Sequence, residues 1–429
     1  MSSENNEQVI RDPLWNAIQL DHHAVQIVNT AAFQRQRYIR QLGFAHLVYP
    51  GATHTRFGHA IGVYHLARVT LEHLRKSGQL ENDVYEEARL IPYAALLHDI
   101  GHYAFSHALE ELGDDFLPGD HEAVSARFFC SDQMRNVLRS LGDNAAGGIH
   151  DLIRGESANP LRGLVSGSLD LDKIEYLRRD ARFCGVPYGE VDVDRLLQGM
   201  LVLEDPTSGK LEIGIHEKAV AALESLLFAK YQMFRNVYWH HGVRAASALY
   251  KRIVYEAVHA GILTREELVG PTDEELIYEI SRRAKTSESD IGRKLSDRWI
   301  PSLKARELPK RIMEVTAAEL DGRVVQEWVL KDSHEKRAFE DRLAEELELE
   351  SGEIVVDFPV KESMFQLDLL IKRTMGGVER LDLSGVSGLI DLPQMAGSLY
   401  AATRVLRIFA FKKRTLNKER VLEEVTREK

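Results

Sequence analysis

Apolar side chains recur at helical intervals through the first 260 residues of the chain. A spacing of three or four positions is typical of helices that bury one face. The pattern predicts helices over four segments: residues 23–41, 56–76, 86–111 and 121–129. Gly101 is expected to end or bend the third of these helices.

Short strands interrupt the helical pattern. Apolar residues at 201–204 and 211–215 predict a β-hairpin, after which residues 216–260 return to helix. From about residue 262 the chain becomes richer in charge and predicts a charged helix followed by strands: residues 334–350, 354–358, 366–371 and 405–409. We therefore expect a mainly α fold, in which a helical core with a small β-hairpin (residues 1–265) precedes a smaller α+β C-terminal domain (residues 266–429) for regulation or oligomerisation.

Composition narrows the class of protein. The 429 residues carry a formal net charge of -11, which disfavours nucleic acid or an anionic membrane as a primary partner. No apolar stretch reaches the roughly 18 residues that a membrane span needs, and the first residues lack the pattern of a secretory signal. Cys130 and Cys184 are the two cysteines, without CxxC spacing, so a reducing compartment, most simply the cytoplasm, is expected.

The dipeptide His98-Asp99 follows a run of apolar residues and is expected to enter the interior, where unpaired charge is costly. His59 lies upstream of it and Asp172 lies downstream. Imidazole and carboxylate groups suit a divalent ion that binds phosphate, and four such ligands leave positions open for water and a phosphate oxygen. Further histidines follow nearby: His102, His107 and His121. One His-Asp pair is most often structural, but this collection indicates a metal or phosphate site.

Three long runs of residues carry a family resemblance. The first run joins residues 12–14, 33–43 and 50–59, the second is 98–107, and the third is 170–180. Through these runs the chain resembles the HD-domain phosphohydrolases, and within them the deoxynucleoside triphosphate triphosphohydrolase branch. The resemblance spans about residues 8–260, and the C-terminal third is only loosely similar.

The resemblance implies a set of metal ligands and catalytic residues. One divalent ion per subunit, which could be Mn, Fe, Mg, Zn or Ni, would be held by four residues: His59, His98, Asp99 and Asp172. The catalytic and supporting positions are His102, His107, Glu110, His121 and Glu122. Among them, His121 is expected to protonate the departing nucleoside oxygen, and Glu110 or Glu122 is expected to orient it.

The resemblance also implies how a nucleotide would be bound. The predicted phosphate contacts are Arg56, Lys173, Tyr176 and Arg235. The predicted sugar contacts are Gln41, Leu42 and Asp180, of which Gln41 and Asp180 would hydrogen-bond a 3′-hydroxyl and Leu42 would crowd a 2′-hydroxyl. One departure is that Val243 aligns with a tyrosine that lies near the sugar in the animal members of the branch.

A regulatory nucleotide site is also implied. Four residues align with regulatory positions: Gln34, Arg37, Asp192 and Arg195. Asn29 stands where the family has an aspartate that reads guanine, so the base specificity is open. For Gln34, Arg35 and Arg37 a solvated helix face is the alternative interpretation, and Phe33 is expected in the core.

The sequence thus predicts a metal-dependent hydrolase that converts deoxynucleoside triphosphates to deoxynucleoside and triphosphate. It would act as a homo-oligomer, a dimer or tetramer, with a possible activator nucleotide. Two alternatives remain open. The same metal chemistry would serve another phosphoester such as a nucleoside monophosphate, a cyclic nucleotide or an alarmone, and a nucleotide-sensing scaffold would bind without turnover.

Overall fold

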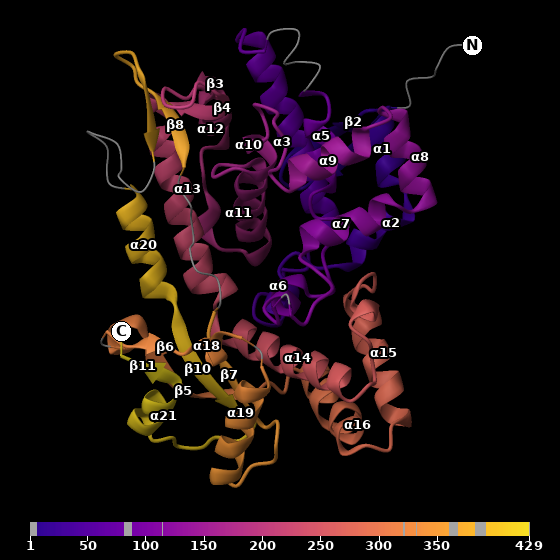
Figure 1. Cartoon of the computed structure of the whole chain (residues 1–429), viewed down its shortest axis with the longest axis vertical. Helices are drawn as coiled ribbons and strands as arrows, with labels where there is room; N and C mark the ends of the chain where they lie inside the picture. Colours follow the sequence, from indigo (N-terminus) through magenta and orange to yellow (C-terminus); the bar gives the residue numbers. More distant parts are fainter. Residues whose placement is uncertain are drawn as a thin grey trace.

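The computed structural model describes residues 7–80, 88–113, 115–320, 322–331, 333–359, 368–381 and 392–428. Helices dominate the first half of the chain (Figure 1). They are α1 (His22–Val28), α2 (Ala31–Gln34), α3 (Arg56–Lys76), α5 (Ile91–Leu97), α6 (Ser106–Glu110), α7 (His121–Phe129), α8 (Asp132–Ser140), α9 (Ala145–Ile153), α10 (Gly163–Ser166) and α11 (Leu171–Cys184).

Helices continue through the second half, where strands separate them. They are α12 (Val193–Gly199), α13 (Val220–Met233), α14 (His241–His259), α15 (Asp273–Thr286), α16 (Asp290–Arg293), α17 (Ile300–Lys304), α18 (Glu327–Leu330), α19 (His334–Glu346), α20 (Leu392–Thr403) and α21 (Lys418–Val425). This confirms the predicted mainly α fold. None of the helices within the described ranges is both long and apolar enough to cross a membrane.

Two helices begin and end where the periodicity predicts them. Helix α3 spans Arg56–Lys76, and α7 spans His121–Phe129 with Asp120 as its N-cap, whose carboxylate accepts a hydrogen bond from the amide of Ala123. Helix α7 buries only part of its surface, whereas α3 is buried on all sides from His59 to Tyr64.

The two other predicted helices of this region are interrupted. The segment 23–41 breaks at Thr30, whose hydroxyl caps α2 by accepting from the amide of Phe33, and then continues as a 3-10 turn over Arg35–Tyr38. The segment 88–111 breaks after α5, and Phe105 adopts a left-handed conformation with φ 47° before α6 begins. Residues 86 and 87 lie outside the described ranges.

Strands form small sheets around this helical framework. The predicted hairpin is confirmed as β3 (Met200–Glu204) and β4 (Leu211–His216), which pair antiparallel. Sequence reading missed the hairpin of β1 (Gln8–Asp12) and β2 (Asn16–Leu20), whose five-residue strands are too short for a clear alternation. Near the C-terminus, β10 (Val405–Ala410) lies between β5 (Lys310–Thr316) and β7 (Ile354–Asp357), and β6 (Val324–Val325) pairs with β11 (Thr426–Arg427).

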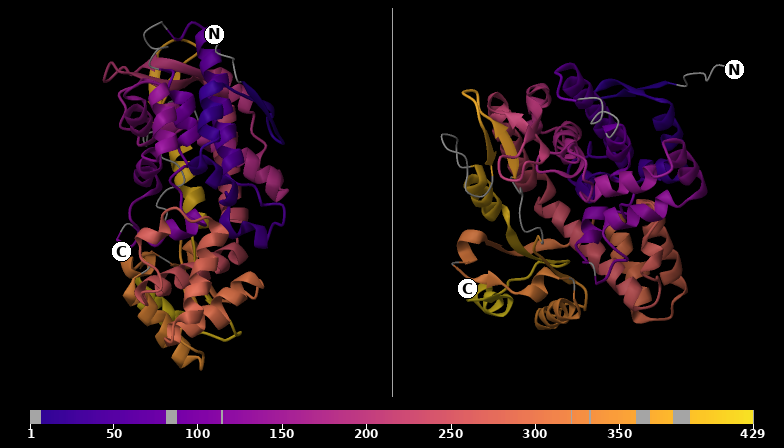
Figure 2. Two further views of the ribbon diagram at one scale, coloured as in Figure 1. Left: turned by 90° about the vertical axis from the view of Figure 1, so that its right-hand side faces the viewer. Right: turned by 45° about the horizontal axis from the view of Figure 1, so that its top comes forward.

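One sheet joins residues from both halves of the chain. β8 (Leu369–Lys372) pairs parallel with β4 and antiparallel with β9 (Val378–Leu381), which extends the hairpin to four strands. Figure 2 shows this late segment alongside the earlier hairpin, while β5, β7 and β10 lie at the opposite end of the molecule and α20 runs between the two ends (Figure 1). Residues 366 and 367 of the predicted strand lie outside the described ranges.

Candidate active site

The four predicted metal ligands come from three separate helices. His59 lies in the first turns of α3, His98 and Asp99 follow the last residue of α5, and Asp172 lies in the first turn of α11. Because α5 ends at Leu97, the backbone turns there, and both His98 and Asp99 reach one point. His59 and Asp99 are buried, whereas His98 and Asp172 are partly exposed.

The donor atoms of these residues surround a common point. His59 Nε2 lies 2.9 Å from Asp172 Oδ1, 3.3 Å from His98 Nε2 and 3.6 Å from Asp99 Oδ2. His98 Nε2 lies 3.3 Å from Asp99 Oδ1 and 3.5 Å from Asp172 Oδ1. Neighbouring ligands of an octahedral ion with bonds of about 2.1 Å are about 3 Å apart, so His59, His98 and Asp172 could together hold one divalent ion. Asp99 lies beside these three and also forms a group with His102 and His121 that could hold an ion.

Hydrogen bonds at Nδ1 fix the orientation of the His59 and His98 rings. His59 Nδ1 lies 2.6 Å from Glu175 Oε2, and His98 Nδ1 lies 2.8 Å from the carbonyl oxygen of Ala95. Since both partners are acceptors, each Nδ1 carries a proton and donates it. The Nε2 lone pairs are thereby directed to the common point, as in known histidine metal sites.

The electrostatics of the cluster favour a positive charge at its centre. Burial opposes protonation of His59, but its hydrogen bonds to Asp172 and Glu175 outweigh burial and raise its pKa to about 10. Burial also opposes ionisation of Asp99, yet the Arg56 guanidinium, with His98 and His102, holds the pKa of Asp99 well below its usual range. Asp99 therefore stays charged. Since His59 with this pKa carries a second proton on Nε2, a divalent cation bound there would take the place of that proton.

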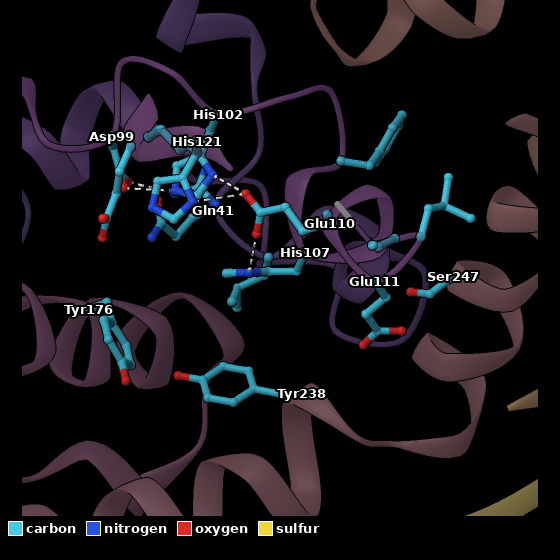
Figure 3. A pocket seen from close by; sticks show the side chains of 18 of the residues that line it. Gln41, Asp99, His102, His107, Glu110, Glu111, His121, Tyr176, Tyr238 and Ser247 are labelled. Atoms are coloured by element: carbon cyan, nitrogen blue, oxygen red, sulfur yellow. Dashed lines mark hydrogen bonds and ion pairs between the residues drawn. The ribbon is translucent and has the colours of Figure 1, made fainter. Parts of the chain in front are cut away.

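A second histidine cluster adjoins this centre (Figure 3). The rings of His102 and His121 are stacked with centroids 3.8 Å apart, and Glu110 Oε1 lies 2.8 Å from His102 Nδ1 and 3.1 Å from His121 Nδ1. His102 Nε2 lies 2.9 Å from Asp99 Oδ1, which links the pair to the predicted metal ligands.

The two stacked rings differ in charge. Burial, Arg56 and His121 lower the pKa of His102. Burial also opposes protonation of His121, but the hydrogen bond and charge of Glu110 outweigh it and raise the pKa of His121. His121 is therefore the ring of the pair that holds a proton more firmly, as a proton donor requires.

The two remaining predicted catalytic residues lie at the edge. His107 is largely exposed, and its Nδ1 is 4.0 Å from Glu110 Oε2. Glu122 lines the same cavity as His107 and His121. Of the two carboxylates considered for orienting His121, the structure places Glu110 within hydrogen-bond distance.

The predicted phosphate contacts are brought together only in part. Arg56, Lys173 and Tyr176 line the cavity. Arg56 Nη1 donates to Asp99 Oδ2 at 2.6 Å, while its buried Nε and Nη2 have no partner among the described residues. Lys173 Nζ donates to Asp170 and, at 2.9 Å, to the carbonyl oxygen of Gly167. Arg235 is not among the described residues that line the cavity, and its Nη1 donates to Tyr231 Oη at 2.8 Å instead.

The predicted sugar contacts line the same cavity. Gln41 is buried, and its Oε1 has no hydrogen-bond donor among the described residues. Asp180 accepts a hydrogen bond from Tyr238 Oη at 2.7 Å, and His54 Nε2 lies 2.8 Å from its other oxygen. A buried acceptor without a donor is costly, so the Gln41 side chain is suited to a ligand hydroxyl.

The four predicted regulatory residues form two separate pairs. Arg37 Nε donates to Gln34 Oε1 at 2.7 Å beside α2. The Asp192 carboxylate caps α12 by accepting from the amide of Arg195 at 3.0 Å. Figure 1 shows α2 and α12 well apart within the chain. Asn29 is the C-cap of α1.

Known proteins match both parts of the chain. The model of the HD domain matches residues 56–157, and the model of the HD associated region matches residues 191–402. An uncharacterized protein of Methanocaldococcus jannaschii is 31% identical over 378 residues, which is 87% of this chain and 74% of that protein. The chain belongs to the HD phosphohydrolase family.

Other relatives of this HD protein match a smaller share of their length. The deoxynucleoside triphosphate triphosphohydrolase SAMHD1 of Gallus gallus is 30% identical over 265 residues, which is 54% of this chain and 42% of SAMHD1. A hypothetical protein from Aquifex aeolicus has the same fold in its crystal structure. Its TM-score is 0.69 at 22% identity, and the match covers 98% of each chain.

Sequence reading missed two residues of this HD site. Glu175 is completely buried and orients His59. Its three-residue spacing from Asp172 places both carboxylates on one face of α11, and this spacing could have identified it from the sequence. Tyr238 faces Tyr176 across the cavity, with ring centroids 6.5 Å apart (Figure 3). Tyr238 therefore lies beside Asp180, although the sequence comparison matches Val243, five residues later, to the tyrosine near the sugar.

Proposed function

We propose that this HD protein hydrolyses deoxynucleoside triphosphates to deoxynucleoside and triphosphate. The observation that carries the proposal is one cavity of about 1200 Å³ that combines the His and Asp cluster, partly unpaired Arg56, and the buried acceptor of Gln41. A volume of this size exceeds that of most small-molecule sites. The similarity to SAMHD1, a deoxynucleoside triphosphate triphosphohydrolase, supports the same substrate class.

The metal would be held by His59, His98, Asp99 and Asp172. A divalent ion bound there supplies a Lewis acid and lowers the pKa of water. Mixed imidazole and carboxylate ligands accept Mn, Fe, Mg, Zn or Ni, and the metal identity is left to experiment.

The remaining groups bind the nucleotide and move a proton. Water adds to the α-phosphorus, the bond from phosphorus to the 5′ oxygen breaks, and His121 gives its proton to that oxygen. The proton that the added water loses passes to solvent, from which His121 is protonated again. Glu110 favours the protonated form of His121, because its carboxylate lies 3.1 Å from Nδ1 and raises the pKa of the ring. The free Arg56 nitrogens and Lys173 neutralise the phosphates, since guanidinium and ammonium groups both bind phosphate oxygens.

The sugar would bind where Gln41, Leu42 and Asp180 line the cavity. Gln41 accepts a hydrogen bond from the 3′-hydroxyl, Asp180 and Tyr238 contact the same hydroxyl, and Leu42 crowds a 2′-hydroxyl. A site built to pair a hydroxyl rejects analogues that leave its polar groups unpaired. We therefore expect a preference for deoxynucleotides over ribonucleotides.

Product analysis tests the proposal. Purified protein with Mn²⁺ or Mg²⁺ is incubated with each deoxynucleoside triphosphate, with and without added nucleotides as activators, and the products are separated by chromatography. Nucleoside plus triphosphate is expected from the wild type. Asp172→Asn should abolish turnover, whereas Asp194→Asn on the exposed face of α12 should not.

Other products would overturn the assignment. Release of monophosphate, or turnover only of cyclic nucleotides, monophosphates or alarmones, would identify a different phosphoesterase. Binding of nucleotides without any product would identify a sensing scaffold.

Regulation and assembly are part of the proposal. The pairs Gln34–Arg37 and Asp192–Arg195 lie apart within one chain, so a nucleotide that touches both pairs would bind between two chains of a dimer or tetramer. Light scattering with and without nucleotide tests this, and a monomer under both conditions would contradict it. Because both cysteines are free thiols, we expect the protein to act in the reducing cytoplasm.

A further inference from the structure

Residues 270–273, which lead into α15, contact two loops beside the cavity. One loop is the turn at Phe105, and the other is residues Arg40–Gly43. Asp273, the first residue of α15, is completely buried. Its Oδ1 accepts a hydrogen bond from the backbone amide of Phe105 at 2.7 Å, and its Oδ2 accepts one from the backbone amide of Arg40 at 2.9 Å. Phe105 directly precedes the helix of His107 and Glu110, and Arg40 directly precedes Gln41.

The backbone at Phe105 needs outside support. Its φ of 47° lies in the left-handed region, which bulky side chains rarely adopt. Its ring stacks on Phe44, with centroids 4.1 Å apart and an interplanar angle of 5°, and it also packs against Tyr250. The Asp273 carboxylate holds the amide while these rings hold the side chain, so the turn is fixed from both sides.

Arg35 ties the same turn to the same segment. Its guanidinium donates to the carbonyl oxygens of Gly270 at 2.5 Å and Pro271 at 3.1 Å. It also donates to the carbonyl oxygen of His102 at 2.7 Å. Residues 270–273 are thus joined to the His102–Phe105 turn by two side chains of opposite charge.

Asp273 is not required to cap its own helix. Thr272 is the N-cap of α15 and forms a capping box with Glu275, whose carboxylate accepts from the amide and hydroxyl of Thr272. Burial raises the pKa of Asp273 to about 6, although the hydrogen bonds from the amides of Arg40 and Phe105 and the Arg40 guanidinium, 3.4 Å away, oppose that rise. A buried carboxylate with this cost serves the two loops that it contacts rather than its own helix.

We propose that Asp273 is a positioning residue for the active site. It joins the Phe105 turn to the Arg40–Gly43 loop, so that the His102, Glu110 and His121 cluster and the sugar-side Gln41 face the same substrate. Its role in turnover rests on the proposed function, whereas its hydrogen bonds to the amides of Phe105 and Arg40 do not depend on that function.

Hydrogen exchange resolved to single residues tests these hydrogen bonds directly. In the wild type, the amides of Arg40 and Phe105 should exchange at least about 100-fold more slowly than in an unfolded chain, which requires a stable acceptor. Asp273→Asn keeps the size of the side chain but leaves one acceptor for two amides. We expect exchange at one or both amides to rise at least about tenfold. Unprotected amides in the wild type, or unchanged exchange in the variant, would overturn the proposal.

Kinetics test the consequence, with Thr272→Ala as the matched control. Asp273→Asn should lower kcat about tenfold and raise KM several-fold with unchanged metal content, because both loops shift while the metal ligands do not. Thr272→Ala removes the capping box of the same helix and should lower the Tm with kcat and KM unchanged. An equal kcat loss in both variants would show a merely structural role. If the wild type releases no triphosphate, the proposed function fails. The exchange experiment still shows whether Asp273 fixes the two loops.

Discussion

At the scale of single residues, the site depends on which nitrogen of each histidine carries the proton. Glu175 and the Ala95 carbonyl oxygen accept hydrogen bonds from Nδ1 of His59 and His98, so the Nε2 atoms face the predicted metal site. Glu110 similarly sets the charge of His121. Glu175 and Glu110, which are outside the predicted ligand set, therefore influence the orientation of His59 and the charge of His121.

Replacing Glu175 with Gln should weaken metal binding. The amide keeps the volume but removes the charge that holds the Nδ1 proton of His59, and loss of such a partner costs about 10- to 100-fold in metal affinity. Titration of the metal against a competing chelator measures the change. Glu266→Gln, an exposed substitution of the same kind, is the control, and equal affinities for the two variants would contradict the role of Glu175.

Replacing Glu110 with Gln should shift the pH profile. A general acid must be protonated, so kcat falls as pH rises through the pKa of His121. Glu110 raises that pKa, which extends activity to higher pH. In Glu110→Gln the alkaline limb of kcat should therefore move to lower pH. An unmoved limb would show that His121 does not titrate in this step.

At the scale of elements, the site depends on how closely two segments approach. Gly101 lies in the turn after α5, where an added Cβ would lie 2.0 Å from the carbonyl oxygen of His121 and 2.7 Å from the amide of Ser125. The missing side chain allows α7 to place His121 against His102. The sequence indicated Gly101 as a helix end, and the structure adds that α7 packs on it.

Gly101→Ala should therefore impair both stability and catalysis. Overpacking against backbone costs about 1–3 kcal/mol of unfolding free energy, and the displaced α7 should lower kcat. Urea denaturation and steady-state kinetics measure the two effects. Gly147→Ala on α9, where an added Cβ meets no atom within 4 Å, should instead be neutral or stabilising by up to about 1 kcal/mol.

At the scale of the whole molecule, the two halves of the chain share both a sheet and a buried ion network. β8 pairs with β4 of the helical half. Arg244 on α14 donates to Glu111 after α6, at 2.7 Å and 2.8 Å, and to Asp357 on β7, at 2.6 Å and 2.8 Å. Residues far apart in sequence thus complete the same interior, and the division at residue 265 stays a prediction.

A chain truncated to residues 1–265 should not fold cooperatively. The edge of β4 would lose β8, and the buried Arg244 would keep Glu111 but lose Asp357, one of its two carboxylate partners. Near-UV circular dichroism and urea denaturation of the fragment, measured beside the full chain, test this. A fixed tertiary signal with one sharp transition in the fragment would contradict it and would support an independent core.

The sequence by itself determined the elements whose signals are local. Periodicity predicts α3, periodicity and the Asp120 cap predict α7, and the residue types of the four expected ligands predict a metal donor set. Only the tertiary structure decided the left-handed turn at Phe105, the parallel pairing of β8 with β4, the hydrogen bond between Glu175 and His59, and the hydrogen bond between Arg235 and Tyr231. Each of these depends on partners from other parts of the fold or on the direction of a side chain, which short-range spacing does not encode.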